Sequence, residues 1–249
     1  MLNEETRRKL RELGIPSAID YLTLQYKDPD SIHLSFEERF QGMVDYMYQE
    51  KYNTTVQRLI KLAKFRLPSA QINNIYYGSR GLDKNLLAEL STLQFMRTST
   101  NLIFQGLTGS GKTFLSCAIG VEACKAQYRT QYIRLPDLLV QYDESTLLPM
   151  GPRKLLKKYA KYELLIIDEW LLDRMSSEEL NFIFELVELR LDSVSTILCT
   201  QFTRADWHDR LGGGVRADAI MDRIVHNAIW IDTGTKNMRE FTAKQRLEI

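Results

Sequence analysis

The spacing of hydrophobic positions changes near residue 100 of the chain. Beyond that point, short β-rich apolar runs alternate with stretches in which apolar residues recur at helical intervals. Strands are predicted at 101–105, 130–134, 164–168, 196–200 and 228–231. This alternation is typical of an α/β fold in which crossover helices connect the strands of a mostly parallel sheet. We therefore expect a five-stranded, mostly parallel sheet.

Before residue 90 the pattern is helical and is divided by start and stop signals. Two residue pairs have the spacing of a capping box, in which each side chain satisfies the backbone amide of the other: Ser35 with Glu38, and Thr54 with Gln57. Pro68 is expected to end a helix, and Asp83 is expected to begin the next one. These signals predict a small all-helical domain at 1–66, a linker at 67–82 and an α/β domain at 83–249.

The composition is that of a folded protein with balanced charge. The 249 residues include 33 Lys and Arg against 32 Asp and Glu, for a formal net charge of +1. Such a chain has no overall field to attract a polyanion, so nucleic acid would have to bind at local patches. The longest aliphatic run, 164–167, is too short to span a bilayer. We expect a cytoplasmic protein without membrane contact.

A glycine-rich segment follows the first predicted strand and precedes a helical run. It reads Gly-Leu-Thr-Gly-Ser-Gly-Lys-Thr and fits the P-loop pattern, whose backbone amides surround phosphate groups. Lys112 would reach the β and γ phosphates of ATP, and Thr113 would hold Mg²⁺. The predicted nucleotide-binding residues are Gly106, Leu107, Thr108, Gly109, Ser110, Gly111, Lys112, Thr113 and Phe114.

Polar residues end the third and fourth predicted strands. Asp168 and Glu169 follow four aliphatic residues, which places Asp168 to orient Mg²⁺ and Glu169 to act as general base on the attacking water. At the end of the fourth strand, Gln201 or Thr200 can lie near the γ-phosphate. A plain strand end at the surface is the alternative interpretation of that segment.

The order of these parts resembles the IstB transposition-helper ATPases, which are related to the DnaC helicase loaders and, more distantly, to the DnaA-type AAA+ initiators. Beyond the two nucleotide motifs, the resemblance rests on the segments 10–24, 58–64, 81–83, 207–208 and 219–228. It implies that residues 83–249 form an AAA+ ATPase domain. It also implies that ATP hydrolysis acts as an assembly switch in a homo-oligomer with shared ATP sites.

The same resemblance implies an arginine that acts on a neighbouring subunit. In this family an Asp-Arg pair before the last strand lies at a subunit boundary, which makes Arg223 the candidate arginine finger. Arg210 and Arg216 are competing candidates for this role. The alternative interpretation of Arg223 is a surface ion pair with Asp222 or Asp218.

One feature departs from the family pattern, and another agrees with it. Relatives commonly have Thr-Ser-Gln or Thr-Ser-Asn after the fourth strand, whereas this chain has Cys199-Thr200-Gln201, which weakens the assignment of Gln201. Only residues 232–249 follow the last predicted strand, and this is too short for a helical lid. We therefore expect no carboxyl-terminal lid domain and no sensor arginine from one, as in the family that the chain resembles.

Two groups of basic residues interrupt the overall charge balance. Residues 51–82 contain no acid and six basic residues: Lys51, Arg58, Lys61, Lys64, Arg66 and Arg80. The same segment contains Phe65, Tyr76 and Tyr77, whose rings are expected to stack on bases if nucleic acid binds there. Residues 153–161 also contain no acid, and helical spacing leaves Leu155, Leu156 and Tyr159 to pack on the sheet. The candidate DNA-binding residues are Arg58, Lys61, Lys64, Arg153, Lys154, Lys157 and Lys158. A solvated basic helix is the alternative.

Together these features predict an ATP-dependent, DNA-binding regulator that self-assembles on DNA and presents a target site to the transposase of its insertion element. A replicative helicase loader is the alternative, because it would have the same ATPase with a different partner. A small-molecule P-loop kinase is a third hypothesis. It requires a phosphoacceptor pocket and a closing lid, and the sequence shows no segment for either.

Overall fold

The computed structural model describes residues 2–78 and 81–247. The chain divides into two compact units between Arg58 and Leu59. The predicted helical domain extended to residue 66, whereas the residues from Leu59 onwards pack with the second unit. Ala63 and Phe65 are buried in the hydrophobic core of that second unit, which explains why the boundary lies before residue 66.

The first unit is helical. It contains α1 (Glu4–Glu12), α2 (Ser17–Lys27), a 3₁₀ turn η1 (Pro29–His33) and most of α3 (Phe36–Ala63). The predicted capping box at Ser35 is confirmed, because the Ser35 amide donates to the Glu38 carboxylate at 2.7 Å and the Glu38 amide donates to Ser35 Oγ at 3.2 Å.

Two predicted helix boundaries in this region are wrong. Thr54 lies inside α3, so the capping-box spacing there marks no helix start. The helix continues through this position because residues 36–63 contain no proline and only one glycine, Gly42. The helix ends at Ala63 because Lys64 takes a left-handed conformation with φ 55°, well before Pro68.

The segment predicted to be a linker is built into the second unit. It contains the short turn η2 (Ile72–Asn74), and Ala70, Ile75 and Leu82 are buried in the core. Arg80, one of the six basic residues of 51–82, lies outside the described residues. As predicted, Asp83 begins the next helix, α4 (Lys84–Ser91), and a short helix α5 (Gln94–Arg97) follows.

The second unit is organised around one parallel sheet of five strands. The strands are β1 (Asn101–Gln105), β2 (Thr130–Arg134), β3 (Leu164–Asp168), β4 (Ser195–Thr200) and β5 (Ala228–Asp232). Their order across the sheet is β2-β3-β4-β1-β5, and every neighbouring pair is parallel. The predicted fold and strands are thus confirmed. Because β3, β4 and β1 are neighbours, the polar residues at their carboxyl ends meet at one edge of the sheet.

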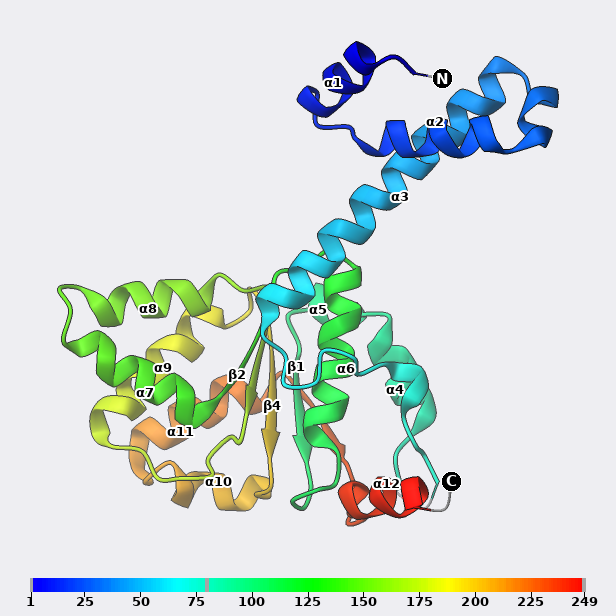
Figure 1. Ribbon diagram of the computed structural model, residues 1–249. Coiled ribbons are helices and arrows are strands. Elements are labelled where there is room, and N and C mark those ends of the chain that lie inside the picture. The colour runs from blue at the N-terminus through cyan, green and yellow to red at the C-terminus, as the bar shows by residue number, and fades with distance from the viewer. Residues whose placement is uncertain (1, 79–80, 248–249) are drawn as a thin grey trace. The chain divides into compact units, whose positions relative to one another are not determined.

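Helices cover both faces of the sheet (Figure 1). On one face lies α6 (Lys112–Lys125) with α4 and α5, and on the other lie α7 (Leu135–Thr146), α8 (Gly151–Ala160), α9 (Ser177–Arg190), α10 (Arg204–Arg210) and α11 (Gly214–Val225). Alternate strand residues therefore enter different cores: Ile166 packs on the α6 side, and Ile167 packs on the α9 side.

Two further details bear on the site. The predicted packing of α8 is confirmed, since buried Tyr159 and its neighbours Leu155 and Leu156 belong to the core on that face. After β5 the described chain forms one helix, α12 (Met238–Leu247). None of the described helices is long and apolar enough to cross a membrane.

Candidate functional site

The glycine-rich segment forms the turn between β1 and α6. A side chain at Gly106 would bring its Cβ to 2.2 Å from Thr233 Oγ1, and one at Gly109 would bring its Cβ to 2.4 Å from Asn237 Oδ1. Both glycines have positive φ angles, 154° and 84°. The turn therefore requires glycine for its backbone conformation and for the close approach of the segment after β5.

The side chain of Lys112 folds back onto this turn. Its Nζ atom donates to the carbonyl oxygens of Gly106 at 2.7 Å and Leu107 at 2.9 Å. Burial lowers the pKa of Lys112; the charge of Asp168 acts in the opposite direction, and the charge of Arg239 lowers the pKa further. The ammonium group is thus a partly desolvated cation at the point where a P-loop holds phosphate.

Asp168 stands at the end of β3 with both carboxylate oxygens engaged. Thr113 Oγ1 and the Tyr132 hydroxyl each donate to Asp168 Oδ2 at 2.7 Å, and the Glu169 amide donates to Oδ1 at 2.8 Å. Burial, and then the charge of Asp168, raise the pKa of Tyr132, so its hydroxyl stays a donor. An alcohol and a carboxylate in contact beside a phosphate-binding turn form an oxygen set of the kind that fits Mg²⁺.

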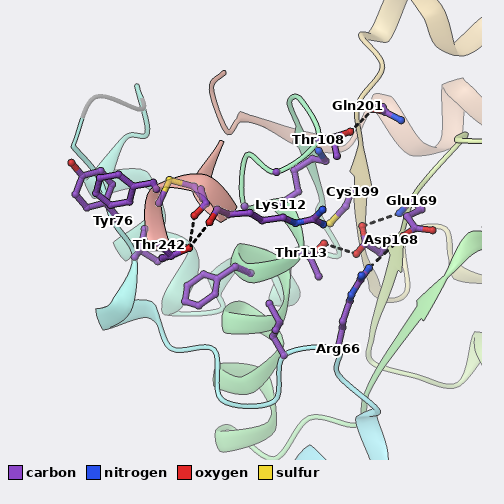
Figure 2. A pocket seen from close by; sticks show the side chains of 18 of the residues that line it. Arg66, Tyr76, Thr108, Lys112, Thr113, Asp168, Glu169, Cys199, Gln201 and Thr242 are labelled. Atoms are coloured by element: carbon purple, nitrogen blue, oxygen red, sulfur yellow. Dashed lines mark hydrogen bonds and ion pairs between the residues drawn. The ribbon is translucent and has the colours of Figure 1, made fainter. Parts of the chain in front are cut away.

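Glu169 follows in a left-handed conformation, with φ 57°. Its carboxylate forms ion pairs with two arginines, at 3.4 Å to Arg66 Nη1 and 3.5 Å to Arg134 Nη1. Figure 2 shows Arg66 extending toward the Asp168 and Glu169 pair at one end of the pocket. The predicted general base therefore lines the pocket, where it forms ion pairs with one arginine of the pocket wall, Arg66, and one outside it, Arg134.

Gln201 reaches the P-loop from the end of β4. Its Oε1 atom accepts a hydrogen bond of 3.0 Å from Thr108 Oγ1 (Figure 2). The contact arises because β4 is hydrogen-bonded to β1, the strand that leads into the turn. Gln201 is thus placed among the predicted nucleotide-binding residues, and its role as a sensor stays a prediction.

These residues surround a cavity of about 740 Å³, a size suited to a nucleotide. The predicted residues that line it are Thr108, Gly109, Gly111, Lys112, Thr113, Phe114, Asp168, Glu169 and Gln201. Gly106, Leu107 and Ser110 are not among the lining residues. They support the turn, the first two through their carbonyl bonds to Lys112 and Ser110 through a 2.6 Å contact of its Oγ with Thr233 Oγ1.

The rest of the cavity wall comes from residues that were not predicted to belong to the nucleotide site. The additional lining residues include Arg66, Asn73, Asn74, Tyr76, Met238, Arg239 and Phe241. The rings of Tyr76 and Phe241 lie 4.4 Å apart, and Lys236 Nζ lies over both. The available signal was the aromatic pair Tyr76 and Tyr77, which we interpreted as a nucleic-acid contact. Tyr76 instead lines the cavity of the P-loop.

Arg239 reaches the cavity from the segment after β5, where no arginine of the site was expected. The described chain after β5 forms a single helix, α12. This helix docks on the P-loop, because the Met238 amide donates to the Gly109 carbonyl at 2.8 Å. Its next residue, Arg239, lines the cavity. A short terminal helix thus supplies an arginine that was not expected.

Arg223, the predicted arginine finger, does not line this cavity. Its guanidinium pairs with Glu188 on α9 and donates to the Ala219 carbonyl at 3.0 Å. The alternative partners are engaged elsewhere, since Asp222 pairs with His226 and Asp218 pairs with His208. Arg223 therefore makes a surface ion pair within its own chain, with a partner that sequence reasoning had not considered.

The two competing arginines differ in their surroundings. Arg210 donates to the Leu171 carbonyl at 2.9 Å and 2.6 Å and lies over the Phe202 ring, so it supports the loop after Glu169. Arg216 is exposed near the start of α11. Arg210 is consequently the least suited of the three to reach a neighbouring molecule.

The candidate DNA-binding residues are divided among several places. Arg58 belongs to the first unit. Lys61 is exposed near the end of α3, and Arg153, Lys154 and Lys157 are exposed on α8. Lys64 and Lys158, from the two separate basic groups, line one hollow of about 400 Å³. The structure thus brings the two basic groups together in one hollow, with Lys64 and Arg66 from the first group and Lys158 from the second.

Residues 8–246 match the family model described as IstB-like ATP binding protein. A Pseudomonas fluorescens protein named for the insertion sequence IS1162 and for ATP binding is 32% identical over 205 residues, which cover 81% of this chain and 87% of the relative. A Sinorhizobium fredii protein, y4uH, also named for an insertion sequence and ATP binding, is 29% identical over 96% of both chains.

Solved structures share the fold. The crystal structure of DnaI superposes with a TM-score of 0.58 at 20% identity, over 69% of this chain and 91% of that one. The DnaC helicase loader superposes with a TM-score of 0.55 at 20% identity, over 66% of this chain and 96% of that one. These similarities establish a fold of the AAA+ type.

Proposed function

This chain belongs to the family of IstB-like ATP binding proteins and is an ATPase, and from this premise we propose that it self-assembles on DNA and assists the transposase of its insertion element in target-site selection and DNA insertion. The observation that carries the proposal is the contact between Thr113 and Asp168 beside the P-loop, with Glu169 next in the chain. Relatives named for insertion sequences support the link to transposition.

In this proposal the P-loop amides and Lys112 hold the β and γ phosphates of ATP. Thr113 and Asp168 are the residues that would hold Mg²⁺, which when bound neutralises charge on the phosphate oxygens. Glu169 accepts a proton from water as the water oxygen bonds to the γ-phosphorus. The bond from that phosphorus to the bridging oxygen breaks, and ADP and phosphate leave.

Other residues of the cavity position the substrate. The Tyr76 end lies across the cavity from Glu169 (Figure 2), which suits it to receive the adenosine portion of ATP. Gln201, bonded to Thr108, is placed to orient the attacking water, and Arg239 is placed near Lys112 to contact phosphate. Together they supply the orientation on which phosphoryl transfer depends.

The site is proposed to be completed by a neighbouring chain. Arg223 lies outside its own cavity, so it would act on the ATP of a second copy, and it would first have to leave Glu188. There it would neutralise the charge that develops on the γ-phosphoryl group. ATP would then bridge two chains, and hydrolysis would release them.

Replacing Arg223 by Ala is expected to lower turnover by about 10³-fold, a typical contribution of an arginine finger. Mixing this variant with Lys112→Ala should restore part of the activity, because the Lys112→Ala chain still carries Arg223 and the other chain still binds ATP. The matched control is Arg216→Ala, measured alone and in the same mixture. Unchanged turnover in Arg223→Ala, or a comparable loss in Arg216→Ala, contradicts the assignment to Arg223.

Assembly is tested by electron microscopy of the purified protein with duplex DNA. We expect filaments or rings with a non-hydrolysable ATP analogue, and their loss with ADP. A monomer that is indifferent to DNA in both states contradicts the proposal. A parallel binding assay against the transposase and against a replicative helicase separates the proposed function from the helicase-loader alternative.

A further inference from the structure

A second hollow lies beside the ATP cavity, along the outer strand β2. It has a volume of about 400 Å³, and four cations from three segments of the chain line it: Lys64, Arg66, Arg134 and Lys158. The end of α3 is fastened to the same strand, because Gln131 Nε2 donates to the Ala63 carbonyl at 3.2 Å. This contact fixes the segment that carries Lys64 and Arg66 against β2.

The hollow has an excess of positive charge. Among its described lining residues Asp137 is the one acid, and it holds Arg134 at 2.6 Å. Burial, and then the charge of Lys64, lower the pKa of Lys158. Two lysines from distant parts of the sequence therefore repel each other here, and an anion between them would relieve that repulsion.

The hollow is connected to the catalytic carboxylate. Arg66 lines both cavities, and Arg66 and Arg134 are the two arginines paired with Glu169. Their contacts with Glu169, at 3.4 Å and 3.5 Å, are longer than the contacts of 2.6 Å and 2.8 Å between Arg134 and Asp137. The pairs with Glu169 are therefore the weaker ones, and an anion that attracts the guanidinium groups would break them first.

We propose that a phosphate of the DNA backbone binds in this hollow and draws Arg66 and Arg134 away from Glu169, which frees the carboxylate to accept a proton from the attacking water. The inference rests on the proposed binding of DNA. A polymer fits better than a free ion, because the basic surface continues from Lys158 along α8 through exposed Lys157, Lys154 and Arg153. These residues can contact further phosphates of the same strand.

The variant that isolates this coupling is Arg134→Gln, since Arg134 lines the hollow but does not line the ATP cavity. It should raise DNA-free turnover about two- to fivefold, the size expected for removing one partly exposed ion pair. It should also lose the part of the DNA stimulation that comes from releasing the Arg134 pair, while the part that comes from releasing the Arg66 pair remains. Steady-state ATP turnover over a range of duplex concentrations measures both effects. Lys84→Gln, at an exposed position on α4, is the charge-matched control and should behave as the wild type.

A second variant tests the hollow while leaving both arginine pairs with Glu169 in place. The double variant Lys64→Gln, Lys158→Gln should need more duplex for half-maximal stimulation. The slope of log affinity against log salt should become shallower by about two. Fluorescence anisotropy with labelled duplex gives these affinities independently of ATP turnover.

The outcomes separate the inference from the proposed function. Absence of duplex binding by the wild type contradicts both. If the wild type binds duplex and Arg134→Gln keeps wild-type DNA-free turnover and full stimulation, the coupling is wrong and the proposed function stands. Full stimulation by inorganic phosphate alone overturns the assignment to the DNA backbone. Salt slopes that are identical in the wild type and the double lysine variant overturn the hollow as the binding site.

Discussion

Replacing Glu169 by Gln should lower ATP turnover by about 10²- to 10⁴-fold, the range attributed to general acid–base catalysis, while ATP still binds. The amide has nearly the same shape but cannot accept the proton of the attacking water. Its carbonyl still accepts hydrogen bonds from Arg66 and Arg134, and these partly exposed pairs contribute no more than about 1 kcal/mol each. The fold should therefore persist. Turnover assays and nucleotide titration measure the two effects.

The matched control for this variant is Glu185→Gln, an exposed glutamate on α9, which should keep wild-type turnover. Because ATP binds without being consumed, Glu169→Gln should form assemblies on DNA that persist after ATP is added. Near-normal turnover would show that another group activates the water. Loss of ATP binding in Glu169→Gln would instead show that Glu169 has a structural role.

Replacing Lys112 by Ala should lower both affinity and turnover. Charged hydrogen bonds contribute about 1.5–3 kcal/mol, so ATP affinity should fall by about 10- to 100-fold. Turnover at saturating ATP should fall by a further 10²- to 10³-fold, as when a transition-state donor is removed. In the structure the ammonium group bonds only to the turn's own carbonyl groups, those of Gly106 and Leu107, among the described contacts. These carbonyl groups are only partly buried, so water can replace the ammonium group as their donor.

The control is Lys84→Ala at the exposed start of α4, which should bind and hydrolyse ATP normally. The Lys112→Ala chain should also fail to assemble on DNA with ATP, in contrast to Glu169→Gln. Wild-type ATP affinity in Lys112→Ala, measured by titration calorimetry, would contradict the placement of the phosphates at this turn.

The parts of the fold and the site that could be predicted are those encoded by contiguous residues. The five strands are short apolar runs, and the P-loop is a segment with one backbone geometry, so local spacing was sufficient. The contact between Thr113 and Asp168 agrees with the expectation that both residues serve the same Mg²⁺, and it forms because β1 and β3, with β4 between them, end at the same edge of the parallel sheet.

The parts that could not be predicted depend on contacts between distant segments. Tyr76 and Arg239 are separated by more than half the chain, and only the docking of α12 on the P-loop brings them to one cavity. The pairs of Glu169 with Arg66 and Arg134 likewise join three segments. The length of α3 was missed for a different reason, because a capping-box spacing inside a helix is no barrier to the helix continuing.

The ATP site is proposed to be completed by a second copy of the chain. The most direct test is ATP turnover per chain as a function of protein concentration, with and without duplex DNA. We predict that turnover per chain rises with protein concentration to a plateau and that duplex DNA moves the rise to lower concentration. Turnover per chain that is constant over the whole range, in the presence and absence of DNA, would contradict the claim.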